Sequence, residues 1–86
     1  MLEHKHWRSF WSDIPGQDRW TFVQLVDAAL ADATKVVNAM RKLEGARNIQ
    51  RETLILNRGK DYRKDGDILY VRDALVMVVI SYDVEV

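Results

Sequence analysis

The sequence predicts an α+β domain in which one long amphipathic helix, about residues 21–44, packs on an antiparallel sheet of three to four strands within residues 50–86. Apolar residues recur at spacings of three and four in the first region, as on one face of a helix. Residues 75–86 instead keep apolar residues at every even position, which is the period of a strand. Since 86 residues without a linker or repeat suit a single domain, we expect one unit, 1–86.

The composition excludes several classes of protein. Thirteen basic and thirteen acidic residues cancel, so no overall field attracts nucleic acid or an acidic membrane. There is no cysteine, which excludes disulfides and thiol chemistry and fits a reducing compartment. The longest apolar run, 74–80, is far short of the roughly 20 residues that a membrane helix needs, and the charged N-terminus does not resemble a signal peptide. We expect a soluble, cytoplasmic protein.

The N-terminal segment, residues 1–16, is predicted to be a short helix or an aromatic arm. Trp7, Phe10 and Trp11 have the i, i+3, i+4 spacing of one helical face. Pro15 and Gly16 then form a strong turn signal that ends the segment.

The main helix has clear start and stop signals. Thr21 and Gln24 match a capping box, and Trp20 and Leu25 flank it at the positions of a hydrophobic staple. Gly45 is suited to the residue just past the helix end. The apolar stripe is too broad for a coiled-coil seam and suits a helix lying across a sheet. It contains Phe22, Val23, Leu25, Val26, Ala29, Leu30, Ala33, Val36, Val37, Met40 and Leu43.

Three strand regions follow the helix. Residues 53–56 form the core of the first. The Asp65-Gly66 pair predicts a two-residue hairpin turn between 62–64 and 67–71, with Lys64 opposite Asp67. The last strand, 75–85, completes an antiparallel sheet of three strands, or four if residues 60–64 also pair.

Both faces of the last strand begin with apolar residues, which is its most informative property. The even positions, from Val76 to Val86, are natural partners of the helix. The odd positions Leu75, Met77 and Val79 need a second cover, because leaving them in water forgoes about 1.5–3 kcal/mol each. Two covers are possible. Either the N-terminal segment folds back over this face, or a second copy or another protein covers it, and an exchanged N-terminal arm would combine the two.

No catalytic, metal or cofactor site is expected. His4 and His6 form the only histidine pair, and it lacks a third ligand. The four glycines form no phosphate-binding loop, and no serine or threonine lies in a nucleophile motif. The acidic residues near Tyr62 resemble an acid–base set of a small ribonuclease, but local turn chemistry accounts for them equally well.

A basic hairpin gives an alternative function. Its residues could contact phosphates, and its tyrosine could stack on a base. They are Arg58, Lys60, Tyr62, Arg63 and Lys64. Cross-strand pairing in a solvated hairpin explains the same residues, and no known nucleic-acid-binding motif accompanies them.

The function that the sequence favours is a small non-enzymatic module for protein–protein interaction or assembly. It would form a homo-oligomer or dock on another protein through the face and/or the edge of its sheet. The predicted partner-binding residues are Leu75, Met77 and Val79, helped by Trp7 and Trp11, since tryptophan is over-represented at interfaces. The alternative is a nucleic-acid-binding or ribonuclease-like protein that uses the basic hairpin 58–64.

Overall fold

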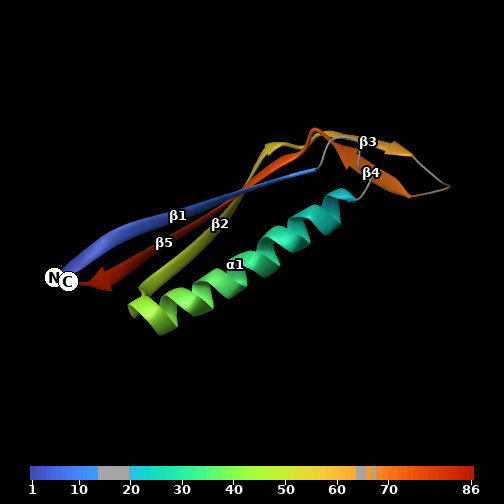
Figure 1. Cartoon of the computed structure of the whole chain (residues 1–86). Helices are drawn as coiled ribbons and strands as arrows, with labels where there is room; N and C mark the ends of the chain where they lie inside the picture. Colours follow the sequence, from blue (N-terminus) through green and yellow to red (C-terminus); the bar gives the residue numbers. More distant parts are fainter. Residues whose placement is uncertain (14–19, 64–65, 67) are drawn as a thin grey trace.

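A computed structural model describes residues 1–13, 20–63, 66 and 68–86. Its elements are β1 (Leu2–Ser12), α1 (Phe22–Glu44), β2 (Arg47–Asn57), β3 (Lys60–Arg63), β4 (Leu69–Arg72) and β5 (Leu75–Glu85). A three-stranded antiparallel sheet has the order β1-β5-β2, and β3 and β4 form a separate two-stranded sheet. Figure 1 shows α1 lying along one face of the larger sheet, with the β3–β4 hairpin projecting at the end opposite to the termini. The predicted α+β class is confirmed.

Helix α1 begins and ends where its capping residues predict. The Thr21 hydroxyl accepts a hydrogen bond from the Gln24 backbone N–H at 3.2 Å, and the Gln24 side chain accepts one from the Thr21 N–H at 3.0 Å. Gly45 follows the helix in the left-handed region, with φ 64°, where a side chain would be strained. The predicted limits of the main helix are therefore confirmed.

Strand β5 is the central strand, and its two faces differ as the sequence predicts. Val76, Val78 and Ile80 are fully buried beneath α1, and Tyr82 and Val84 nearly so. Val86 lies beyond the end of the strand and is exposed, so the last of the even positions does not reach the helix. On the other face Leu75, Met77 and Val79 are only half-buried.

The core lies between α1 and the sheet. Ala29 and Ala33 are fully buried against β5, since their small side chains let the helix axis approach the strand closely. Leu25 joins a second cluster with Val71 and Ala74, which ties the hairpin end of the molecule to the helix start. A backbone hydrogen bond of 2.8 Å from the Val71 N–H to the Trp20 carbonyl reinforces this junction. Two stripe residues, Val23 and Leu43, lie outside the core and are exposed.

The predicted N-terminal helix is wrong, because residues 2–12 form strand β1 at the edge of the sheet. β1 pairs with β5 in register from Leu2, opposite Glu85, to Ser12, opposite Leu75. Half-buried and exposed residues alternate along it with a period of two. The i, i+3, i+4 spacing of three aromatic residues fits a helix, but the same residues are also strong strand formers. A neighbouring strand from the other end of the chain decides between the two.

The strands after the helix differ from the prediction in membership and register. β2 is longer than the predicted 53–56, and the hairpin strands do not join the main sheet, where β1 takes the third position. The hairpin itself is present, but Arg63 pairs with Leu69, whereas a two-residue turn would set Arg63 opposite Ile68. The predicted Lys64–Asp67 pair and Asp65 lie outside the described residues. Among the described residues, no helix has the length and apolar character that a membrane span requires.

Candidate functional site: the open face of the sheet

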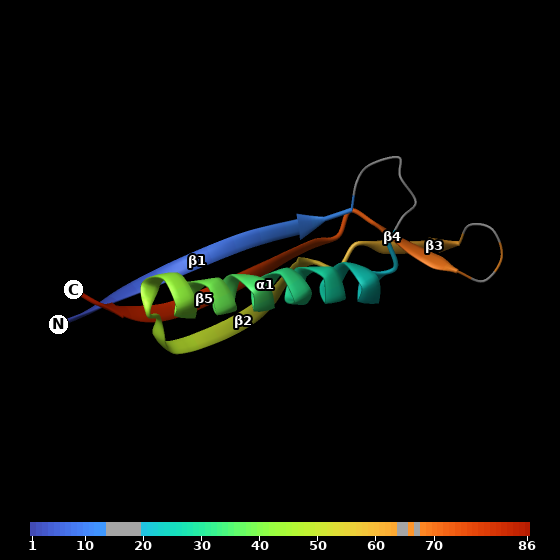
Figure 2. The ribbon, with the colours of Figure 1, turned by 60° about the horizontal axis from the view of Figure 1, so that its bottom comes forward.

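Helix α1 lies along only one face of the sheet (Figure 1), and Figure 2 shows it in front of β5, with the uncovered face turned away from the viewer. Residues directly opposite each other on paired strands share a face, so the register places side chains from all three strands on this open face. Met77 lies between Phe10 of β1 and Leu54 of β2. Leu75 and Val79 precede and follow Met77 on the same side of β5. We call these five residues, Phe10, Leu54, Leu75, Met77 and Val79, the open patch.

The open patch is apolar and accessible. Phe10 is 61% exposed, and the other four are half-buried. None of the described helices and strands packs over them, since α1 lies on the opposite face. A contiguous apolar patch that crosses three strands is the kind of surface at which soluble proteins associate.

Charged side chains flank the open patch. The register places Arg8 of β1 and Glu52 of β2 on either side of Val79. Both are exposed, and neither forms an ion pair with another described residue. At the level of Val79, the open face therefore carries a positive group on β1 and a negative group on β2.

The other half of the open face is polar. His4 Nδ1 lies 2.7 Å from Asp83 Oδ1, and the Asn48 amide donates a hydrogen bond of 2.9 Å to Asp83 Oδ2. The bonds from Asn48 and His4 lower the pKa of Asp83. His6 Nδ1 lies 3.1 Å from Ser81 Oγ, and the two imidazoles pack edge to face. No group of three or more metal-ligating side chains with suitable geometry occurs among the described residues.

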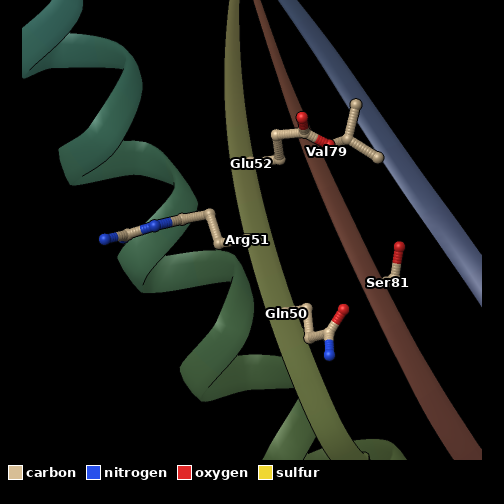
Figure 3. Close-up of a pocket in the computed structure, with 5 residues that line it drawn as sticks. All are labelled: Gln50, Arg51, Glu52, Val79 and Ser81. Carbon is tan, nitrogen blue, oxygen red and sulfur yellow. The ribbon is translucent and has the colours of Figure 1, made fainter.

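A shallow hollow of about 500 Å³ lies beside the open patch on this polar half. Figure 3 shows Gln50 next to Ser81 and Glu52 next to Val79, with the Arg51 side chain turned away toward α1. Arg51 donates a hydrogen bond of 3.2 Å to the Thr34 hydroxyl, which fixes it on the helix side. The hollow contains no paired acid and base, so it has no evident catalytic arrangement.

The structure separates the predicted partner-binding residues into two groups. Leu75, Met77 and Val79 lie together on the open face, as predicted. Trp7 and Trp11 lie on the opposite face and pack against the core clusters beneath α1. The N-terminal segment therefore pairs beside β5 instead of folding over its open face. Phe10 was predicted only as one of the three aromatic residues of that segment.

Two residues of the open patch, Phe10 and Leu54, were not predicted as partner-binding residues. Trp7 and Trp11 are at odd positions and Phe10 is at an even one, so in a strand Phe10 points to the opposite face from the two tryptophans. A strand prediction for residues 2–12 would have separated them. Leu54 lies in the run 53–56, in which both odd and even positions carry apolar residues. The run therefore does not indicate which of its sides faces the helix.

One arginine of the basic hairpin is paired within the hairpin itself. The Arg58 guanidinium donates two hydrogen bonds, of 3.2 and 3.0 Å, to the Asp61 carboxylate and also stacks over the Phe22 ring. The Arg72 guanidinium lies 3.8 Å from the centre of the Tyr62 ring and occupies one of the two ring faces on which a base could stack. Lys60 and Arg63 are exposed on β3, and Lys64 lies outside the described residues. These contacts do not favour the nucleic-acid alternative.

Comparisons of the chain with protein-family models, with curated proteins and with solved structures give no significant match.

Proposed function

We propose that this protein is a non-enzymatic assembly module that associates with another protein surface through the open patch. The observation that supports the proposal is the juxtaposition of Phe10, Met77 and Leu54 across three strands, on a face without a cover among the described elements. Contact with water is unfavourable for such a surface by about 25 cal/mol for each Å². A bare apolar strand face also promotes non-specific aggregation, which a specific partner would prevent.

A carboxylate in the middle of the open patch tests this proposal. Met77→Asp introduces a carboxylate that would be buried in the interface without a cation or hydrogen-bond donor to compensate it. Association through this face should therefore be lost. Leu43→Asp is the matched control, because Leu43 is 82% exposed at the end of α1 and lies outside the sheet. Both variants should remain folded by circular dichroism, since neither residue is in the core.

Two measurements compare these variants with the unmodified protein. Light scattering should give a mass above the 10.0 kDa of one chain for the unmodified protein and for Leu43→Asp, but a lower mass for Met77→Asp. If the unmodified protein is monomeric, the open patch should bind an apolar fluorescent dye, and Met77→Asp should weaken that binding selectively. Equal masses and equal dye binding for the two variants would contradict the proposal.

The basic hairpin remains an alternative prediction. It would require retention of the protein on heparin with a steep dependence on salt, lost when Arg63 and Lys64 are both replaced by alanine.

A further inference from the structure

The open face is complementary to itself. Arg8 and Glu52 flank Val79 on the two outer strands, and Phe10 and Leu54 flank Met77 in the same way. These two rows across the sheet thus have matching groups at their two edges. We propose that the partner covering the open patch is a second copy of this chain, docked face to face about a two-fold axis that runs along β5. This inference rests on the proposed function and specifies its partner.

An axis along β5 brings complementary groups together. Rotation by half a turn exchanges the two sides of the sheet but leaves the position along the strand unchanged, so β1 of one copy lies over β2 of the other. Arg8 then faces Glu52 of the second copy, and Phe10 faces its Leu54, each contact occurring twice. Met77 meets its own counterpart at the axis. Packed sheets lie about 10 Å apart, a distance that an arginine and a glutamate span together.

An axis across the strands fits less well. If this axis passes near Ile80, the full faces overlap, but Met77 of one copy lies over Asp83 of the other and Val79 lies over Ser81. Apolar groups are then set against polar ones. If it passes through Met77, the patches overlap, but the polar half of each sheet extends beyond the other copy. The axis along β5 combines full overlap of the faces with apolar contacts across the open patch, and at the polar end it sets Asp83 over the Asp83 of the second copy.

Full overlap is necessary because the face is small. Eleven residues at about 3.3 Å each and three strands about 4.8 Å apart give a face of roughly 36 by 14 Å. Two such faces amount to roughly 1,000 Å² in projection, near the lower limit for a specific interface. A partial overlap would fall below it. Charged pairs at the rim add little affinity but fix which surfaces meet, which is the role we assign to Arg8 and Glu52.

A charge-exchange experiment tests this geometry. Arg8→Glu alone would set glutamate against Glu52 twice in a homodimer, and Glu52→Arg alone would set arginine against Arg8 twice. Each single variant should dissociate about tenfold more readily, equivalent to about 1.4 kcal/mol. A mixture of the two restores both pairs in the heterodimer. Since the variants differ in mass, native mass spectrometry should show the heterodimer well above its statistical share, at the stability of the unmodified dimer.

A second pair of variants controls for attraction between oppositely charged proteins. Lys35→Glu and Asp27→Arg change the net charge by the same amounts at exposed positions of α1, on the far side of the molecule from the open face. Their mixture should give homodimers and heterodimers in statistical proportions.

The outcomes separate this inference from the proposed function. If Met77→Asp abolishes a dimer but the Arg8 and Glu52 variants mix statistically, the open patch is an interface and the two-fold geometry is wrong. A monomeric unmodified protein whose open patch binds the apolar dye would refute the second copy while leaving a different protein as the partner. A dimer that survives Met77→Asp would refute both, and would direct attention to pairing along the exposed edges of β1 or β2.

Discussion

Replacement of Gly59 by alanine should destabilise the protein far more than the same change at Gly45. Both glycines have left-handed φ angles, 72° and 64°, so an alanine at either position bears a similar backbone strain of about 1–2 kcal/mol. The surroundings differ. A Cβ at Gly45 would meet nothing within 4 Å, whereas one at Gly59 would lie 2.4 Å from the Arg72 carbonyl oxygen and 2.8 Å from the Ala74 nitrogen.

Both atoms that a Cβ at position 59 would meet belong to the backbone, so no rotamer change can relieve the contact. The β4–β5 junction would have to move, which would also disturb the 3.0 Å hydrogen bond from the Ala74 N–H to the Asp13 carboxylate. Overpacking of this kind typically costs about 1–3 kcal/mol. Gly59→Ala should therefore exceed Gly45→Ala by about that amount, and each kcal/mol lowers Tm by about 4–8 °C in a domain of this size.

Thermal unfolding followed by circular dichroism measures this difference, with all proteins at one concentration because association would itself raise Tm. Gly45→Ala supplies the strain without the contact and is the reference. Equal losses of Tm in the two variants would refute the close approach of Gly59 to the β4–β5 junction. That result would not contradict the left-handed φ angles of Gly59 and Gly45.

Two further predictions concern the core and the polar half of the open face. Ile80→Ala should cost about 2–5 kcal/mol in urea unfolding because Ile80 is fully buried beneath α1, whereas Ile55→Ala, at a half-exposed position on the edge strand, should cost under about 1 kcal/mol; similar losses would place the core elsewhere. The pKa of Asp83 is lowered from its usual 3.8, so the ionised group stabilises the folded state above that pH and ceases to do so as the pH falls through the lower, folded-state value. The Tm advantage of the unmodified protein over Asp83→Asn should thus persist at pH 5 and shrink below about pH 4; a constant advantage down to pH 2 would contradict the hydrogen bonds from Asn48 and His4.

Local signals were sufficient for the helix and for the central strand. Thr21, Gln24 and Gly45 satisfy backbone groups at the helix ends through contacts a few residues away, so their positions in the sequence fix its limits. The parity of β5 likewise follows from its own residues, because side chains alternate along any strand. Leu75, Met77 and Val79 could therefore be placed on the face opposite to α1 before any strand partner was known.

The strand β1 could not be predicted in the same way. A short segment rich in tryptophan and phenylalanine can form either a helix or a strand, and its choice depends on what its backbone N–H and C=O groups can bond. Those partners belong to β5, more than 60 residues away in the chain. The hairpin strands were predicted to join the main sheet for the same reason, because the sequence does not show that β1 occupies the position beside β5.

One capped helix and one strand that is apolar on both faces could be predicted from the residues alone, because capping and alternation act over a few residues. The strands that flank β5 are known only from the fold, and they bring Phe10 and Leu54 into the open patch and set Arg8 and Glu52 beside it. Strand register is set by hydrogen bonds between distant segments, and a shift of one residue would turn every one of these side chains to the other face of the sheet.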